Sequence, residues 1–502
     1  MLLNARRIVA GALCFALALP GLPAAAQPVG LPSMGAASAD ELSPDMEREL
    51  GQAIMVQGRL DPTYIDDAEL NQYLTSVGRK LAAHAPNPVP PIEMFGVLDP
   101  EINAFTLPGG FIGVNTGLIL TCESESELAG VLGHEIGHVA QRHIARGMTQ
   151  SGQNGMIALA SMAAALVAGL AARSGDLAMG IAAFGQAAAV DRQLEFSRNA
   201  EREADRAGLR MLYEAGYDPR GMARIFGRLM MASRLNEGRG GGPWASTHPQ
   251  SIERMTDMQN RIRDLPAVHY TDSADFWFLR AKVRVLQGGD SQALRDIRET
   301  LRSEAVADQG VRRAAALYGL ARYWLHREDL KQAASYWDKA KAAWPDGAPE
   351  LAKLGIDIAL ARKDASSAVE QAQAAIKRWP HRQALGMSYA TALQDAGRVA
   401  DAQAYLRAKA REWGKDQPDV YQMLARSEDR SGGKVAARRD MAQYYLATGA
   451  YAAAAYQLQQ ARSLSTDFYE QSELDAQLHD VRMRLQDERN LLEKFKDVVP
   501  KG

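Results

Sequence analysis

Apolar residues recur at helical spacing along most of this chain, and a short stretch of strand-like pattern interrupts them. Ser43-Pro44-Asp45 is typical of a helix start, with Ser43 as N-cap and Pro44 at the first helical position. A second helix is predicted over Asp67–His84 and ends before a proline-rich segment. The pattern therefore predicts a mainly α-helical protein with a small β-sheet. Three short strands, with Pro108-Gly109-Gly110 as a turn, are expected at Ile92–Val97, Ala104–Leu107 and Phe111–Val114.

The next helical stretch, Glu127–Ala140, is apolar at most positions but carries His134, Glu135 and His138. Histidines four residues apart project from one face of a helix and can bind one metal ion, while Glu135 can reach water beside that ion without being a ligand. Two imidazoles suit Zn²⁺, and a catalytic zinc site needs a third protein ligand and an open position. The alternative is a surface helix that carries these residues by chance. Its apolar surroundings argue against that, because burying three ionisable groups without a metal would be costly.

A third ligand is expected from a second helix, and the charged stretch Ser197–Asp205 is the candidate. Glu201 and Asp205 lie four residues apart, so one carboxylate can bind the metal while the other hydrogen-bonds a ligand histidine from behind. Spacing alone does not separate Glu201 from Glu203, and a solvated helix face is the alternative.

Four sequence elements between residues 40 and 265 occur in one order: N-A-F-T-L-P-G-G, H-E-I-G-H, S-R-N-A-E-R-E-A-D and S-T-H-P. This order resembles the zinc metallopeptidases that include HtpX and the CAAX prenyl endopeptidases. The resemblance implies a gluzincin-type metallopeptidase domain that hydrolyses peptide bonds and holds one Zn²⁺ per chain. It implies Glu201 as the third ligand beside His134 and His138, and Asp205 as the residue that orients His134.

The last of these elements is Ser246-Thr247-His248-Pro249, with Arg254 six residues after the histidine. The resemblance implies that His248 hydrogen-bonds the oxyanion of the transition state, and that Arg254 supports the site from behind. Because a glycine-rich stretch, residues 236–243, precedes it, we hypothesise that His248 also swings onto the fourth position of the zinc and keeps the enzyme latent until substrate displaces it. The alternative is a histidine that caps a helix before Pro249.

A short sheet beside such a site bears on substrate binding, because an exposed edge strand can pair with an extended peptide through its main chain. The resemblance favours the hairpin Asn103–Asn115 as the wall of the cleft, and the alternative is an ordinary packed sheet. The residues expected to line this cleft are Asn103, Ala104, Phe105, Gly109 and Gly110.

Two stretches that follow the helix with the metal motif, Glu127–Ala140, are expected to be structural. Gln141–His143 is expected to continue that helix. His143, five residues after His138, then lies off the ligand face as a solvated or structural histidine. The apolar stretch Met156–Val190 is rich in alanine and glycine, which favours a pair of close-packed helices. Peripheral contact with a membrane is the alternative, and full insertion would instead indicate an intramembrane peptidase.

From about Thr271 the pattern changes to alanine-rich helix pairs with a period near 34 residues, which is typical of tetratricopeptide repeats. Such repeats stack into an α-solenoid whose concave surface binds protein partners. Beyond Tyr444 the copies can no longer be phased. The residues that fit the pattern are Ala281, Ala293, Leu320, Trp324, Ala333, Trp337, Ala340, Pro345, Ala368, Ala375, Pro380, Ala390, Ala402, Leu406, Ala425, Ala437 and Met441.

Composition narrows the class of protein further. A length of 502 residues indicates two or three domains, and a net charge of −2 without a polybasic run argues against nucleic acid as a partner. The N-terminus is typical of a signal peptide, with Arg6-Arg7 before the apolar run Ile8–Leu19 and a cleavage site after Ala26. An uncleaved anchor is the alternative, but the apolar run is short for a spanning helix. Cleavage would leave Cys122 without a disulfide partner, and we expect it to be a packed residue.

These features divide the chain into a signal peptide (1–26), a flexible leader (27–39), a zinc metallopeptidase domain (40–267) and a tetratricopeptide domain (268–502). Export, peptidase domain and repeats together resemble the proteases of outer-membrane quality control. That resemblance implies a periplasmic location, unfolded or misassembled outer-membrane proteins as substrates, and docking of the repeats on the barrel assembly machinery with chaperone-like help. The alternative function is a latched or non-catalytic chaperone whose zinc is mainly structural.

Overall fold

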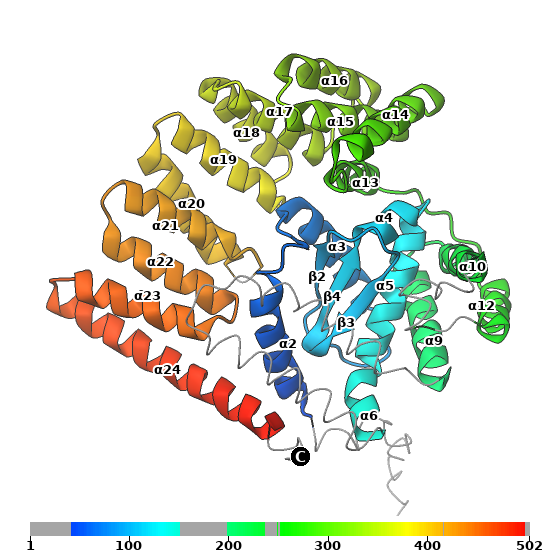
Figure 1. The fold of residues 1–502 in the computed structure, drawn as a ribbon, viewed down its shortest axis with the longest axis horizontal. Coiled ribbons are helices and arrows are strands. Elements are labelled where there is room, and N and C mark those ends of the chain that lie inside the picture. The colour runs from blue at the N-terminus through cyan, green and yellow to red at the C-terminus, as the bar shows by residue number, and fades with distance from the viewer. Residues whose placement is uncertain (1–41, 151–197, 236–247, 249–250, 415, 497–502) are drawn as a thin grey trace, which may run out of the picture.

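The computed structural model describes residues 42–150, 198–235, 248, 251–414 and 416–496, and these residues form one four-stranded sheet with helices around it. Helices α13 to α24 follow one another in an arc beside the sheet and form the helical array (Figure 1). The predicted signal peptide, the leader, the segment Met156–Val190 and the glycine-rich stretch before His248 lie outside the described residues. Among the described helices, none is both long and apolar enough to cross a membrane.

The first two predicted helices are confirmed, and so is the predicted N-cap of the first. Helix α2 spans Pro44–Gly58, and the hydroxyl of Ser43 accepts a hydrogen bond from the backbone N–H of Met46 at 3.2 Å. Helix α3 spans Ala68–Ala82, and the carboxylate of Asp67 caps it in the same way. These side chains satisfy backbone donors that a helix leaves unpaired at its first turn.

The sheet has the order β1-β2-β4-β3. Strand β2 pairs in parallel with β4, which pairs antiparallel with β3, so β3 is an edge strand of the described sheet. The turn between β3 and β4 needs glycine, because Gly109 and Gly110 have φ values of 76° and 87°. Strand β1, only two residues long, was not predicted. The strands are β1 Tyr64–Ile65, β2 Glu93–Val97, β3 Ala104–Leu107 and β4 Phe111–Asn115.

Helix α5, Glu125–Ala140, carries the predicted metal motif and lies between the sheet and the helices α9 and α10. The glycine at position 137 allows α5 and α9 to approach closely. A β-carbon there would lie only 2.7 Å from the carbonyl oxygen of Ala204, which is too close for any other residue. This close packing brings the two predicted ligand helices together. The other helices of this part are α4 Thr116–Thr121, α9 Arg198–Glu214, α10 Arg220–Leu235 and α12 Ile252–Asp264.

The prediction that Gln141–His143 continues α5 is wrong. The helix ends at Ala140, and Arg142 has a left-handed backbone with φ of 51°. The guanidinium of Arg142 binds the carboxylate of Glu47 on α2 at 2.6 Å, which holds this bend against the neighbouring helix. A new helix, α6, begins at His143 and runs to Gln150.

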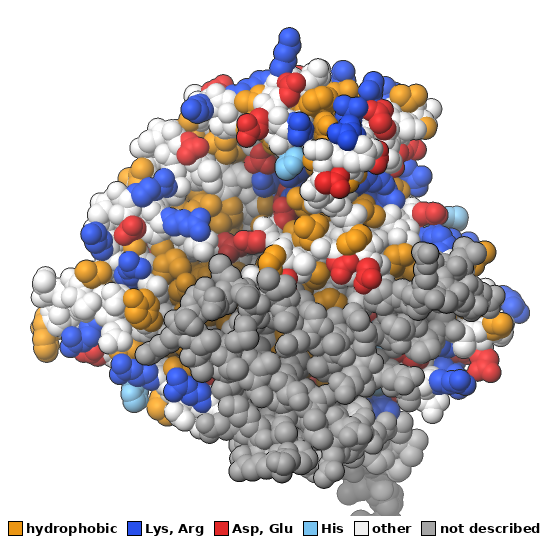
Figure 2. Space-filling view, in the orientation of Figure 1, with side chains coloured by type: hydrophobic (Ala, Val, Ile, Leu, Met, Phe, Trp, Pro, Cys, Tyr) orange, Lys and Arg blue, Asp and Glu red, His pale blue; other side chains and the backbone are white. Residues whose placement is uncertain are grey.

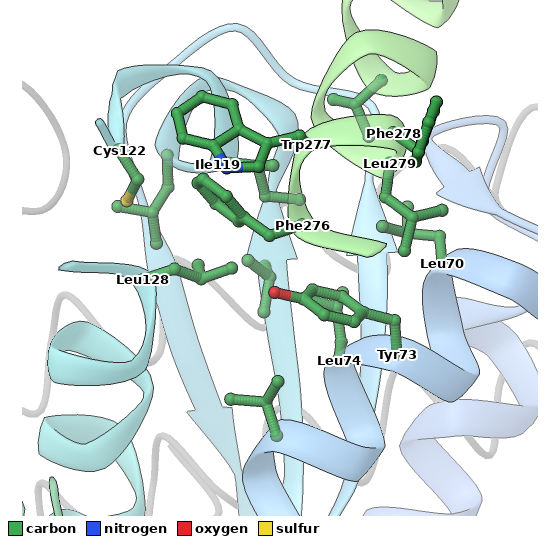
Figure 3. Packing of buried hydrophobic residues seen from close by; sticks show 14 of the residues in the cluster. Leu70, Tyr73, Leu74, Ile119, Cys122, Leu128, Phe276, Trp277, Phe278 and Leu279 are labelled. Carbon is green, nitrogen blue, oxygen red and sulfur yellow. The ribbon is translucent and has the colours of Figure 1, made fainter. Parts of the chain in front are cut away.

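One hydrophobic core extends from the sheet into the first helix of the array, α13, Ala274–Leu286. Figure 3 shows Phe276 and Trp277 of α13 beside Leu128 of the metal helix and Cys122. Cys122 is fully buried, as predicted for a packed residue, and burial raises the pKa of its thiol above the usual range. The same core therefore holds the metal helix and the start of the array.

The array is built of successive helix pairs, and small residues lie where the helices meet. Ala333, Ala340, Ala368 and Ala375 are buried, as the repeat pattern predicted. On the face shown in Figure 2, side chains of both charges are interspersed over these helices. The helices are α14 Ser291–Ala307, α15 Gly310–His326, α16 Leu330–Ala343, α17 Pro349–Ala361, α18 Ala365–Arg378, α19 Gln383–Asp395, α20 Val399–Trp413, α21 Asp419–Arg430, α22 Lys434–Ala447, α23 Tyr451–Leu464 and α24 Phe468–Lys496.

Buried polar contacts join the array to the sheet and the metal helix. The ammonium of Lys282 on α13 lies 2.5 Å from a carboxylate oxygen of Asp67 and 2.6 Å from one of Glu69. Further round the arc, the guanidinium of Arg59 donates to the carbonyl oxygen of Thr448 at 3.2 Å. Between these contacts the sheet and the array enclose a cleft of about 470 Å³.

The first turn of the metal helix is fixed by the segment that enters the array. The carboxylate of Glu125 accepts hydrogen bonds from the hydroxyls of Tyr73, Tyr270 and Ser273 and from the backbone N–H of Ser273, at 2.7 to 2.8 Å. In return, the carboxylate of Asp272 accepts from the backbone N–H of Glu125 at 2.9 Å. Three of these residues follow position 267, where the sequence predicted the end of the peptidase domain.

Candidate metal centre

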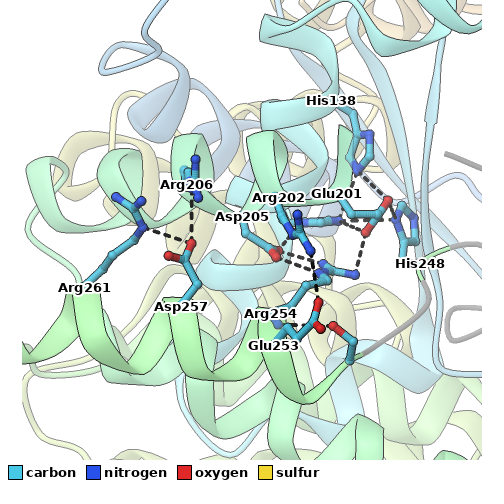
Figure 4. Close-up of polar contacts among 12 residues, drawn as sticks. His138, Glu201, Arg202, Asp205, Arg206, His248, Glu253, Arg254, Asp257 and Arg261 are labelled. Atoms are coloured by element: carbon cyan, nitrogen blue, oxygen red, sulfur yellow. Dashed lines mark hydrogen bonds and ion pairs between the residues drawn. The ribbon is translucent and has the colours of Figure 1, made fainter. Parts of the chain in front are cut away.

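Four buried side chains point toward one another where α5 packs against α9: His134, His138, Glu201 and His248. One nitrogen or oxygen atom from each lies within 4.8 Å of the others. The Nε2 atoms of His134 and His138 are 3.1 Å apart, and Nδ1 of His248 lies 3.3 Å from His134 Nε2 and 3.0 Å from Glu201 Oε1. Figure 4 shows Glu201 between His138 and His248.

Four pairs of these atoms lie at the spacing expected for neighbouring ligands of one metal ion. Bonds of about 2.0–2.1 Å from a central ion place neighbouring ligand atoms about 3.3 Å apart, close to the distances found here. Burial and the nearby His134 and His248 hold the pKa of His138 well below its usual range, so its imidazole is neutral, as a ligand must be. Burial opposes the ionised form of Glu201, but His248 and Arg254 lower its pKa below the usual value. Imidazole and carboxylate donors in this geometry suit a divalent transition metal.

Glu135 lies beside this group and is not one of its four members. Its Oε1 atom is 3.6 Å from Nε2 of His248, and its Oε2 atom accepts a hydrogen bond from the hydroxyl of Thr106 at 3.0 Å. The carboxylate is buried. It lies beside the group on the side of His248, and its action on a metal-bound water stays a prediction.

Asp205 and Arg254, for which the resemblance implied a supporting role, both contact members of the group. Asp205 Oδ1 lies 3.0 Å from Nδ1 of His134. The guanidinium of Arg254 binds both oxygens of Asp205 at 2.7 Å and reaches Oε2 of Glu201 at 2.7 Å (Figure 4). Burial alone would raise the pKa of Asp205, but hydrogen bonds with Arg254 and His134 lower it to about 2. The carboxylate is thus ionised and fixes the tautomer of His134.

The choice between Glu201 and Glu203, which spacing left open, is made by the direction of the two side chains. Glu201 is buried within the group, whereas the carboxylate of Glu203 lies 3.1 Å from Nε2 of His143 and 2.7 Å from the guanidinium of Arg146. His143 in turn has its Nδ1 atom 3.0 Å from Nδ1 of His138. The solvated interpretation of His143 is wrong, since the side chain is buried. The sequence pattern did not predict this contact, because on a continuous helix His143 would point away from His138.

His248 does not cap a helix. The hydroxyl of Ser251 accepts from the backbone N–H of Arg254 at 3.2 Å and is the N-cap of α12. The ring of His248 is buried and faces the other three members of the group. Whether His248 acts as a latch or at the oxyanion stays a prediction.

The residues predicted to line a substrate cleft, Asn103, Ala104, Phe105, Gly109 and Gly110, are all buried. The turn is covered by α2, because a guanidinium nitrogen of Arg48 donates to the carbonyl oxygen of Gly109 at 2.7 Å. The ring of Phe105 packs edge-on against Phe95. Strand β3 packs against the metal helix, and Thr106, which the sequence analysis did not single out, is the residue of this strand that contacts Glu135.

Comparison with known proteins agrees with this site. The description "Peptidase family M48" matches residues 68–262, which contain the four members of the group and both supporting residues. Together with the relatives described next, this shows that the chain belongs to peptidase family M48. It is a metalloendopeptidase whose activity depends on a bound metal.

The chain is similar over most of its length to relatives named "Beta-barrel assembly-enhancing protease". The Escherichia coli (strain K12) relative is 30% identical over 349 residues, which are 68% of each chain. The Yersinia pestis relative is 27% identical over 410 residues, 80% of this chain and 81% of its own. A Vibrio cholerae relative that carries the same name provisionally is 35% identical over 334 residues, 66% of each chain. These similarities extend beyond the peptidase part into the array.

Proposed function

We propose that this chain is an exported zinc endopeptidase that cleaves misfolded or stalled outer-membrane proteins. The observation that carries the proposal is the buried group of His134, His138, Glu201 and His248 with the Glu135 carboxylate beside it. Three imidazoles and one carboxylate are a ligand set that Zn²⁺ favours, which supports zinc as the metal. When bound, zinc would supply Lewis acidity toward the attacking water and the scissile carbonyl.

The residues of the chain then have separate roles in peptide hydrolysis. Glu135, held by Thr106, accepts the proton of the attacking water and delivers it to the leaving amine. Nε2 of His248 lies 3.6 Å from Glu135, so an imidazole N–H on this side can donate to the oxyanion of the tetrahedral intermediate. Asp205 and Arg254 hold His134 and Glu201 in position.

His248 has a second proposed role as a latch. In the described conformation its Nδ1 atom lies among the ligand atoms of the other three residues, which is the corner that water and substrate need. An enzyme in this conformation is inactive until His248 withdraws. This supports a latent state that substrate releases.

Substrate binding is proposed along the outer edge of β3, from Asn103 to Leu107. An unfolded segment could pair there through its main chain, which would give broad sequence tolerance. Thr106 places this strand directly beside Glu135, so a peptide on the strand would pass the site. The buried side chains of Asn103, Ala104 and Phe105 would then support the strand from within, and Gly109 and Gly110 would shape its end.

We further propose that the chain is periplasmic, with its signal peptide cleaved after Ala26, and that the array, read as tetratricopeptide repeats, docks on the barrel assembly machinery and gives chaperone-like help. The printed names of the relatives and the signal-peptide pattern support this location and substrate class. The same array could serve a non-catalytic or permanently latched chaperone. The charged pattern of the chain gives no support for nucleic acid as a partner.

Degradation of an unfolded outer-membrane barrel protein by the purified mature chain tests the proposal. Glu135→Gln and a zinc chelator should each abolish cleavage, by about 10²-fold or more, while Glu135→Gln still binds zinc. Cleavage that survives both treatments would refute the zinc mechanism. If the wild-type chain cleaves nothing but keeps the substrate soluble, the chaperone function is favoured instead.

A further inference from the structure

The bend between α5 and α6 returns the chain toward the metal group. Helix α5 ends at Ala140, and the left-handed backbone of Arg142 starts α6 in a new direction. On a continuous helix a residue five positions after His138 would lie about 140° round the axis from it. The bend instead brings His143 against His138, with their Nδ1 atoms 3.0 Å apart.

A series of hydrogen bonds begins behind His138. The first joins His138 Nδ1 to Nδ1 of His143, and the second joins Nε2 of His143 to the Glu203 carboxylate at 3.1 Å. The guanidinium of Arg146, one turn further along α6, donates to the same Glu203 oxygen at 2.7 Å. His138 and His143 are buried, which protects the hydrogen bond between them from competition with water, whereas Glu203 and Arg146 are half-buried.

The protons of this series can be assigned without conflict. If His138 offers Nε2 to the metal, its other nitrogen carries a proton and donates it to Nδ1 of His143. The proton of a neutral His143 then sits on Nε2, where it is donated to Glu203. The charge of Arg146 keeps Glu203 ionised and able to accept. One tautomer of each imidazole satisfies every contact.

The two ligand histidines of α5 thus have different supports. His134 contacts a carboxylate directly, since Asp205 lies 3.0 Å from its Nδ1 atom. For His138, the carboxylate of Glu203 lies one imidazole further away. Both carboxylates come from α9, which also supplies Glu201 to the metal group.

We propose that His143 is a positioning residue that carries the support of Glu203 and Arg146 to the metal ligand His138. Through the contact between His143 and His138, the packing of α6 against α9 determines the orientation of the His138 imidazole toward zinc. This inference rests on the proposed zinc site. It adds His143, Glu203 and Arg146 to the support of that site, a role that the sequence pattern did not predict for any of them.

Zinc affinity of the purified chain, measured by competition with a chromophoric chelator, tests the inference. His143→Leu should raise the dissociation constant of zinc by about 10- to 100-fold, the usual effect of losing such a support. His143→Asn keeps an oxygen near the position of Nδ1 and should recover part of the affinity. His84→Leu is the matched control, because His84 is a half-exposed histidine that also contacts a carboxylate, lying 3.8 Å from that of Glu214. It should bind zinc as the wild type does.

A double-mutant cycle tests whether Glu203 acts on His138 through His143, an arrangement that we call the relay, or whether the two residues affect the site independently. Glu203→Ala should weaken zinc binding in the wild-type background but have no further effect in the His143→Leu background, because its influence passes through His143. Additive losses would overturn the relay. Thermal unfolding of the metal-free variants shows whether they fold, and if His143→Leu does not, the same cycle is run on His143→Asn.

The outcomes also separate this inference from the proposed function. If wild type and His84→Leu bind zinc tightly and His143→Leu binds it equally well, the relay is wrong and the zinc site stands. If the wild type itself does not bind zinc, the proposed zinc function fails.

Discussion

The hydroxyl of Thr106 on β3 lies 3.0 Å from the Oε2 atom of Glu135 on α5. This hydrogen bond joins the edge strand of the described sheet to the carboxylate that we propose as the general base. Because both residues are buried, the contact fixes the direction of the carboxylate without competition from solvent. A peptide that paired with β3 would therefore meet a base whose orientation the same strand determines.

Replacing Thr106 by valine should lower kcat on an unfolded substrate by about 10- to 150-fold, because losing one hydrogen bond to a charged group costs about 1.5–3 kcal/mol. Zinc affinity should be unchanged, since Thr106 does not contact the four members of the metal group. Steady-state kinetics and zinc titration measure both quantities. Thr391→Val, in which the lost hydrogen bond lies within α19, is the control. An unchanged kcat would show that Thr106 does not position Glu135.

Replacing His248 by alanine tests the latch. The change removes a ring that lies among the ligand atoms of His134, His138 and Glu201, so basal proteolysis should rise severalfold if this corner must be vacated for substrate. The initial rate of cleavage of an unfolded barrel protein is the measurement. Basal proteolysis that stays the same or falls would show that His248 is no latch. A fall in kcat would favour its role at the oxyanion.

Replacing Lys282 by alanine should destabilise the protein by about 3–5 kcal/mol, because Asp67 and Glu69 would remain largely buried without their cation. Denaturant unfolding monitored by circular dichroism measures this loss. The matched control is Lys409→Ala, since Lys409 pairs with an exposed Glu412 on one helix and should change stability by less than about 1 kcal/mol. Equal effects of the two variants would contradict a buried junction.

Asp419 gives a prediction about pH. Burial and the neighbouring Asp66 raise the pKa of Asp419 from 3.8 to about 6, against the opposing charges of Arg59 and Arg426 and a hydrogen bond from Gln417. A raised carboxyl pKa favours the protonated form in the folded state. Stability from this group is therefore present below about pH 4 and is lost as the pH rises through 6, by about 2–3 kcal/mol.

Asp419→Asn should accordingly be more stable than the wild type at pH 7 to 8, and the difference should vanish near pH 4. The free energy of unfolding at several pH values measures it. The control is Asp401→Asn, at an exposed site paired with Arg398. A constant difference across this pH range would show that Asp419 is not protonated on folding.

Local signals in the sequence predicted the parts of the fold that local chemistry determines. Ser43 caps its helix as predicted, the second predicted helix is present, and His134, His138, Glu201 and His248 come together. These successes depend on helix periodicity, capping chemistry and the family resemblance.

What the sequence did not predict depends on tertiary contacts. The bend after Ala140 has no glycine or proline to signal it, because Arg142 adopts its left-handed backbone with its guanidinium bound to Glu47 on another helix. The role of Glu203 follows from that bend, since only a redirected α6 brings His143 to it. Strand β1 is two residues long and carries too little pattern to be recognised.

The hydrogen bonds around Glu125 bear on how this chain can be cut or recombined. A fragment ending at residue 267 would remove Tyr270 and Ser273 and leave Tyr73 as the remaining donor, among those described here, to a buried carboxylate at the start of the metal helix. A fragment meant to fold as an isolated enzyme should therefore end after α13, at about Leu286. In a fusion of this enzyme with helical repeats from another protein, α13 should be kept as part of the peptidase.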